Sequence, residues 1–128
     1  MKTRTSVALA VIAGFGLGAV SIHGLHAQAK PPVFVVVEID VANMDAYMKE
    51  YAPQAQALVK KFGARQLAAS ANVTALSGKA PSRVAVQQWE SLEKVKAWFG
   101  SKEYKENRAI GDKYAKFRIF TVEGTPQP

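Results

Sequence analysis

The residue types available for chemistry in this sequence are mainly carboxylates, lysines, arginines and tyrosines. The chain has no cysteine, and its two histidines, His23 and His26, both lie near the N-terminus. Beyond His26 a Ser-His-Asp triad, a Cys-His pair and a Cys/His zinc site cannot be built. We therefore expect no metal and no cofactor, and either chemistry based on the remaining groups or binding without chemistry.

Glu38 is the best candidate for a catalytic residue, because it interrupts a strongly apolar segment. In a half-dry cavity, burial would raise its pKa and make it a general base. The structural alternative is an ion pair with Arg83 or Arg118, or simple exposure on an open sheet face.

Five further residues are candidates for ligand binding. Arg83 and Arg65 each begin an expected strand, and a guanidinium at a cavity mouth holds a carboxylate by two points. Tyr47 and Tyr51 lie one helical turn apart and could orient a ligand oxygen, while Trp89 offers a stacking surface. The alternatives are a dimer bridge or solvent contact for the arginines, and core packing for the aromatic residues.

These residues depend on a short series of strands and helices. Residues 33–41 are mostly β-branched and predict a strand whose odd-numbered residues form one apolar face. Phe34, Val36, Glu38 and Asp40 fall on its other face. Asn43 is a good N-cap and Gly63 a good end for the helix between them, and Pro53 predicts a kink or restart within it.

The second half of the chain repeats this alternation. Residues 64–69 and 73–76 read as weaker strand pieces that form a hairpin or a bulged strand, and residues 83–89 as a further strand. Ser91 caps a second helix that is interrupted at Gly100 or Ser101, and residues 117–123 form the last strand. The helical apolar edge includes Trp98, and both it and Tyr104 are read as packing residues.

The order strand, helix, strand, strand, helix, strand predicts an α+β fold, the ferredoxin-like βαββαβ antiparallel sheet with helices on one face. The uncovered face bears Phe34, Val36, Glu38 and, by one reading, Trp89. Exposed apolar groups there predict a homodimer.

The N-terminus has the three parts of a secretory signal peptide. Lys2 and Arg4 precede an uncharged apolar run, and Ala27-Gln28-Ala29 supplies small residues at the cleavage positions. We expect residues 1–29 to be removed and residues 30–128 to form one periplasmic or secreted domain, with no membrane association after cleavage. The alternative is a retained anchor, for which the run is marginal in length.

Charge gives little further information about partners. Loss of Lys2 and Arg4 lowers the net charge from +7 to about +5. The basic residues are scattered and do not alternate with aromatics, so we expect no nucleic-acid partner. A small anionic ligand or the cell-envelope surface fits the charge, as does an ordinary solvated basic surface.

A series of short motifs spans nearly the whole mature chain. They are Glu38-Ile39-Asp40-Val41, Asp45-Ala46-Tyr47, Tyr51-Ala52-Pro53, Phe62-Gly63-Ala64-Arg65, Ser77-Gly78, Pro81-Ser82-Arg83, Trp89-Glu90-Ser91-Leu92-Glu93 and Ser101-Lys102-Glu103-Tyr104. In this order they resemble the DUF1330 family, a domain of unknown function within the dimeric α/β barrel superfamily. The sequence departs from the family pattern at Trp89, where phenylalanine is commoner, and in its leader, which many members lack.

The resemblance implies the ferredoxin-like fold, a dimer and a ligand site between sheet and helices or within the barrel. Superfamily relatives include cofactor-free monooxygenases, haem enzymes and small stress-response proteins. The absence of histidine from the mature chain argues against a histidine-ligated haem site. Two functions stay open: binding, with or without slow conversion, of a small anionic or carbonyl compound, and a non-catalytic interaction or stress role in which the open face serves only dimerisation.

Overall fold

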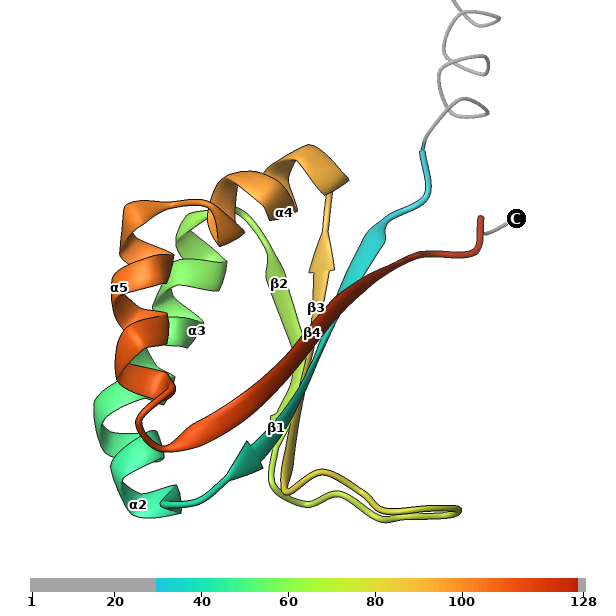
Figure 1. Cartoon of the computed structure of the whole chain (residues 1–128). Coiled ribbons are helices and arrows are strands. Elements are labelled where there is room, and N and C mark those ends of the chain that lie inside the picture. Colours follow the sequence, from blue (N-terminus) through green and yellow to red (C-terminus); the bar gives the residue numbers. More distant parts are fainter. Residues whose placement is uncertain (1–29, 127–128) are drawn as a thin grey trace, which may run out of the picture. The chain divides into compact units, whose positions relative to one another are not determined.

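The sheet is built around strand β1 (Val33–Val41), whose β-branched residues favour an extended backbone. The computed structural model of the protein describes residues 30–126. In it β1 pairs antiparallel with β3 (Arg83–Trp89) and β4 (Ala115–Glu123), and β2 (Arg65–Ser70) pairs antiparallel with β3. The strand order is β2-β3-β1-β4 (Figure 1), so the predicted ferredoxin-like α+β fold is confirmed.

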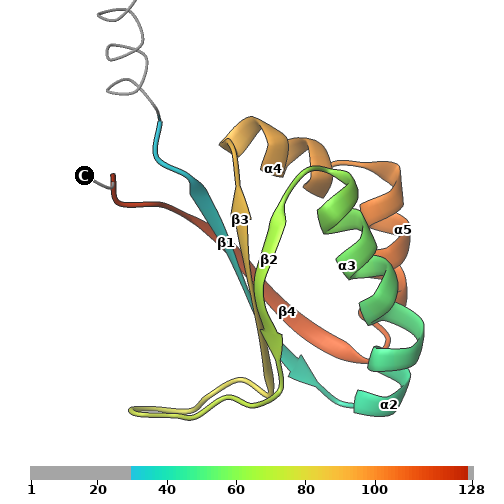
Figure 2. The same cartoon turned by 180° about the vertical axis from the view of Figure 1, so that it is seen from behind.

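The helices cover one face of this sheet, as Figures 1 and 2 show from opposite sides. The first helical region consists of α2 (Met44–Ala46), the π-helical segment η1 (Tyr47–Tyr51) and α3 (Ala52–Lys61). The second consists of α4 (Leu92–Phe99) and α5 (Lys102–Gly111). Asn43, Ser91 and Ser101 each cap a helix by accepting a hydrogen bond from the backbone N–H three residues ahead.

The predicted break at Pro53 takes the form of the π-helical turn. Proline has no N–H, and its ring crowds the carbonyl oxygen four residues earlier, which is that of Lys49. Just before the proline, the Ala52 N–H bonds to the carbonyl of Tyr47, five residues back. Tyr47 and Tyr51, at the two ends of this turn, are both buried against the sheet. The turn therefore delivers two phenol groups to the protein interior.

The two faces of β1 differ as the alternation predicts. Val35, Val37 and Ile39 are at most 6% exposed and form the core beneath the helices. The other face is open in the monomer. Its apolar part includes Phe120 and Val122 of β4, which are 48% and 52% exposed. They lie opposite residues on the same face of β1, namely Val36 and Phe34.

The expected strand at residues 73–76 is wrong. Residues 71–82 instead form a long loop that extends beyond the sheet between β2 and β3 (Figures 1 and 2), and Leu76 in it is 97% exposed. A strand needs a neighbour for its backbone N–H and C=O groups, and none of the described strands continues alongside this segment. The bulged-strand alternative does describe β2 itself, where the pairing register shifts between Gln66 and Ala68.

The expectation that Trp89 lies on the open face is also wrong. Trp89 pairs with Val33 on the helix side of the sheet and is 1% exposed. Alternation shows which residues of one strand share a face, but only the register with the next strand shows which face that is. The sequence alone did not supply this register.

The predicted signal peptide, residues 1–29, lies outside the described residues. Over residues 30–126, no helix combines the length and hydrophobicity needed to cross a membrane.

Candidate functional site

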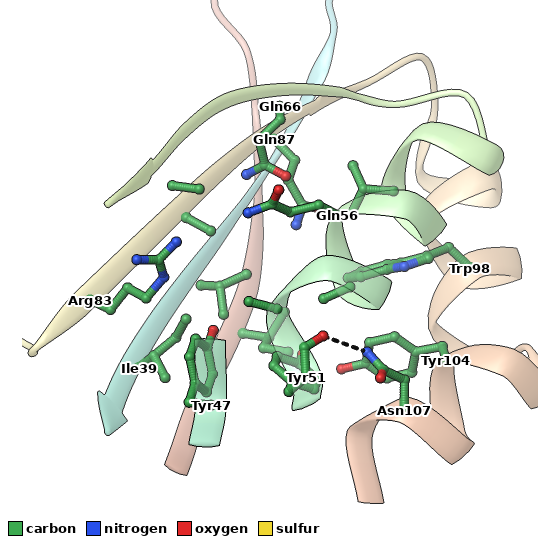
Figure 3. A pocket seen from close by; sticks show the side chains of 17 residues that line it. Ile39, Tyr47, Tyr51, Gln56, Gln66, Arg83, Gln87, Trp98, Tyr104 and Asn107 are labelled. Atoms are coloured by element: carbon green, nitrogen blue, oxygen red, sulfur yellow. Dashed lines mark hydrogen bonds between the residues drawn. The ribbon is translucent and has the colours of Figure 1, made fainter. Parts of the chain in front are cut away.

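A cavity lies between the helices and the sheet (Figure 3). It offers about 50 Å³ to the centres of water-sized molecules. At about 10–15 Å³ for each water, this is space for roughly four waters or a small organic acid. Gln56, which is exposed on α3, is one of the lining residues, so the cavity reaches the surface there. No aspartate or glutamate is among the described residues that line it.

Arg83 is the charged residue of this lining. As the first residue of β3 it lies opposite Ile39, so its side chain is on the helix side, and Figure 3 shows it extending into the cavity. It is 8% exposed, and its Cζ atom lies 5.9 Å from the centre of the Tyr47 ring. No described carboxylate forms a salt bridge with it. A buried guanidinium without a carboxylate is a natural place for an anion.

Tyr47 and Tyr51 stand beside Arg83 as neutral donors. Their ring centres are 5.1 Å apart, and both lie in the cavity lining. Burial raises the pKa of Tyr47, and the positive charge of Arg83 opposes part of that rise. Burial, together with the neighbouring phenols of Tyr104 and Tyr47, also raises the pKa of Tyr51. Both hydroxyls therefore keep their protons at neutral pH.

Two residues of α5 complete the wall opposite the sheet. The hydroxyl of Tyr104 accepts a hydrogen bond of 3.0 Å from Arg108 Nη1, which fixes that end of the side chain. Asn107 is buried, and its Nδ2 donates a 3.4 Å bond to the carbonyl oxygen of Tyr51 (Figure 3). This bond joins α5 to the π-helical turn, so the two helical regions hold the tyrosines in place together.

The two tryptophans differ in their hydrogen bonding. Trp89 Nε1 donates a 3.0 Å bond to Gln87 Oε1. Because an indole N–H can only donate, this bond shows that the Gln87 oxygen faces Trp89, which leaves the amide nitrogen of Gln87 for another acceptor. Trp98 lines the cavity and is 4% exposed, and its Nε1 has no hydrogen-bond partner among the described residues.

Glu38 lies outside this cavity. It is on the open face of the sheet, where its Oε2 is 3.2 Å from Arg118 Nε, and Arg118 Nη1 is 2.9 Å from Asp40 Oδ2. The hydrogen bond from Arg118 lowers the pKa of Asp40. The structural alternative, an ion pair with Arg118, is therefore the arrangement observed, and an ion pair with Arg83 is not, because Arg83 is on the opposite face.

Two of the predicted ligand-binding residues, Arg65 and Trp89, also lie outside the cavity lining. Arg65 is exposed and lies opposite Gln88, away from the cavity. Trp89 packs against Trp98, with ring centres 5.1 Å apart, and is not part of the cavity lining. Of the predicted ligand-binding residues, the structure brings Arg83, Tyr47 and Tyr51 together at one cavity.

Sequence reasoning missed Gln87 and Asn107 and treated Trp98 as packing alone. A usable signal was present in β3, where Arg83 and Gln87 alternate with Ala85 and Trp89 on one face. Polar residues at alternate positions of a buried strand face indicate a polar cavity. No such signal marks Asn107, which reaches the cavity only through the way α5 packs. Among residues 30–126, no group of three or more metal-ligating side chains is close enough to hold a metal ion.

These features define a ferredoxin-like domain of the α+β class with a small cavity between its helices and sheet, rich in hydrogen-bond donors. Comparison of the sequence with protein families agrees with this class. The model of the domain of unknown function DUF1330 matches residues 32–125, so the chain belongs to the DUF1330 family and the resemblance seen in its motifs is confirmed. None of the curated proteins compared with the chain matches it.

Solved structures show the same fold. RPA0582 of Rhodopseudomonas palustris, a protein of unknown function, has a TM-score of 0.64 at 11% identity, covering 84% of this chain and 93% of its own. SnoaB of Streptomyces nogalater, a cofactor-independent oxygenase, has a TM-score of 0.57 at 10% identity, covering 76% and 96%. A protein of Bacteroides thetaiotaomicron, described as a possible oxidoreductase, has a TM-score of 0.50 at 13% identity, covering 74% and 99%. At these identities the likeness concerns the fold alone.

Proposed function

We propose that this protein is exported, forms a homodimer and binds a small organic anion or carbonyl compound in the cavity between its sheet and helices. The observation that carries the proposal is Arg83, a buried cation in a cavity that no acidic residue of the described part of the chain lines. Arg83 holds the carboxylate of the ligand through two parallel N–H···O bonds, for which its planar fork is suited. The compartment rests on the signal-like N-terminus, and the dimer on the open apolar sheet face.

The neighbouring groups orient the ligand. Tyr47 and Tyr51 remain protonated and donate hydrogen bonds to its oxygens. The cavity is small and reaches the surface at Gln56, so the ligand is a small molecule. The fold likeness to a cofactor-independent oxygenase supports a role with small organic molecules. If the protein also converts its ligand, the general base is not Glu38 acting within this cavity, because Glu38 is on the other face of the sheet.

A second candidate function is a non-catalytic interaction role in which the open sheet face serves only dimerisation. The partly exposed Phe120 and Val122 favour it, since neighbouring apolar groups on an open sheet mark an interaction surface. In this case the cavity holds only water. The two functions differ in whether a small acid binds to the purified protein.

Calorimetric titration with a series of straight-chain monocarboxylates, from acetate to hexanoate, tests the proposal. We expect at least one acid to bind wild-type protein and the Arg83→Gln variant to lose that binding at least tenfold. Arg118→Gln is the matched control, because it makes the same chemical change on the opposite face and should leave binding unchanged. Melting curves of both variants confirm that they fold.

Two results would contradict ligand binding at this site. One is the absence of binding by every acid to wild-type protein that native mass spectrometry shows to be an empty dimer, which would favour the interaction role. The other is equal binding by wild type and Arg83→Gln, which would place the acid elsewhere.

A further inference from the structure

Trp98 lines the cavity, and its indole N–H lacks an acceptor among the described residues. Trp98 is 4% exposed, and its Nε1 is buried without a hydrogen-bond partner among the described residues. A buried donor normally finds a partner, and an indole N–H has no ability to accept instead. An acceptor that enters the cavity would supply the missing hydrogen bond.

The contrast with Trp89 shows that this is not a general property of the tryptophans in this fold. Trp89 is even less exposed, yet its Nε1 bonds to Gln87 within the core. Trp98, whose ring centre is 5.1 Å from that of Trp89, belongs to the cavity lining and Trp89 does not. The fold therefore supplies an acceptor for the Trp89 N–H, through Gln87, and supplies none for the Trp98 N–H.

Trp98 and Arg83 lie in different parts of the cavity. Figure 3 shows the two side chains at opposite ends of the cavity, with Tyr47 and Tyr51 between them. A ligand that satisfies both donors must therefore carry two acceptor groups at some distance from each other. The single carboxylate that suffices for Arg83 leaves Trp98 unpaired.

The surroundings of Trp98 also indicate whether the ligand group that accepts its hydrogen bond is charged or neutral. Its nearest ring neighbours are Tyr104, at 4.7 Å between ring centres, and Trp89. The hydroxyl of Tyr104 is already bonded to Arg108, and no cation other than Arg83 is among the described lining residues. A second carboxylate here would be buried without a counter-charge, whereas a neutral carbonyl oxygen needs only one donor.

We infer that the cavity is selective for small oxo acids, with the carboxylate held by Arg83 and a neutral carbonyl oxygen accepting a hydrogen bond from Trp98 Nε1. This inference rests on the proposed function and narrows its ligand class. Trp98 acts in it as a specificity-determining residue. The geometry favours an unbranched acid with the carbonyl near the end distant from the carboxylate.

Paired ligands isolate the proposed hydrogen bond. Calorimetry would compare 4-oxopentanoate with pentanoate, and 5-oxohexanoate with hexanoate, since each pair differs at one carbon that carries the carbonyl oxygen. We expect at least one oxo acid to bind wild-type protein about tenfold more tightly than its parent acid, as one good hydrogen bond allows. Glutarate, which places a second charge near Trp98, should bind more weakly than 4-oxopentanoate.

The variants separate this inference from the proposed function. Trp98→Phe keeps an aromatic ring and removes the N–H. The ratio of the Kd of the parent acid to the Kd of its oxo acid should therefore fall to about one, while plain acids still bind. Trp89→Phe is the matched control and should keep the preference. Arg83→Gln should lose both kinds of acid. Loss of the preference with retained plain-acid binding therefore reports on Trp98 alone.

A spectroscopic measurement on the unaltered protein covers the case in which Trp98→Phe does not fold. The sequence has two tryptophans, so ¹H–¹⁵N spectra contain two indole signals. The Trp89→Phe variant assigns them. The Trp98 signal should move downfield with the oxo acid and much less with its parent.

Equal affinities within every ligand pair, or a preference that persists in Trp98→Phe, would overturn the inference while leaving acid binding by Arg83 intact. In that case water is the partner of the indole N–H. If no acid of either kind binds to wild-type protein, the proposed function fails together with this inference.

Discussion

Replacing Arg83 by methionine should make the unliganded protein more stable while removing its anion site. Methionine has a similar length and no charge. Desolvating a guanidinium costs several kcal/mol, and the cation–π contact with Tyr47, at 5.9 Å, returns only about 0.5–2 kcal/mol. The cavity is small and reaches solvent, so part of the hydration of Arg83 remains. We expect a net gain of about 1–2 kcal/mol, which is roughly 5–10 °C in Tm for a domain of this size.

Thermal and urea unfolding of purified, ligand-free protein would measure this gain. Lys96→Met is the control, because Lys96 is exposed on α4 and its replacement should change stability by about 0.5 kcal/mol or less. A fall in Tm for Arg83→Met would refute the reasoning. It would mean that the guanidinium is satisfied within the fold, and Arg83 would then be a structural residue rather than a binding group.

Three further predictions concern the surroundings of the cavity. Gly111→Ala should destabilise the protein by about 1–3 kcal/mol in urea unfolding, because the added Cβ would lie 2.7 Å from the Tyr51 ring; an unchanged midpoint would show that this ring yields freely. Glu38→Gln should leave acid binding almost unchanged, since Glu38 lies on the face of the sheet opposite the cavity and Arg118 keeps its ion pair with Asp40; lost binding would show that Glu38 belongs to the site. Burial raises the pKa of all three tyrosines of the cavity above 10.0, so their contribution to the free energy of unfolding should be constant below that pH and fall above it, where the unfolded chain ionises first. Phenolate absorbance would follow that titration, and early ionisation in the folded protein would contradict burial.

Local features of the sequence predicted most of the fold. The apolar alternation of Val33–Val41 identified the face that packs under the helices, and Asn43 and Ser91 identified two helix starts through their capping side chains. Ser101 was predicted only as a possible interruption, and it caps α5. Pro53 predicted a break, although its form as a π-helical turn was not foreseen. The error at residues 73–76 has a physical reason: those residues favour an extended backbone, but an extended segment becomes a strand only beside a partner.

The site could be predicted only in part, because it is made from residues that are distant in sequence. Arg83, Tyr47 and Tyr51 can be recognised as candidate binding residues from their side-chain chemistry alone. Trp98 looks like any apolar helix residue until the fold makes it part of the cavity lining and buries its N–H without an acceptor among the described residues. Glu38 shows the opposite case, since a carboxylate within an apolar strand looks catalytic until the register places Arg118 beside it.

The two faces of the sheet follow different electrostatic rules, and this difference supports the assignment of the site. On the open face Arg118 lies between Glu38 and Asp40 and forms an ion pair with each. On the covered face, within residues 30–126, Arg83 has no carboxylate partner and Trp98 Nε1 has no acceptor, although burial makes both conditions more costly there. A sequence selected only for stability would place the unpaired groups on the exposed face and apolar groups inside. A buried cation without a carboxylate and a buried indole N–H without an acceptor, both on residues that line one cavity, are best explained by a ligand that supplies oxygens to them.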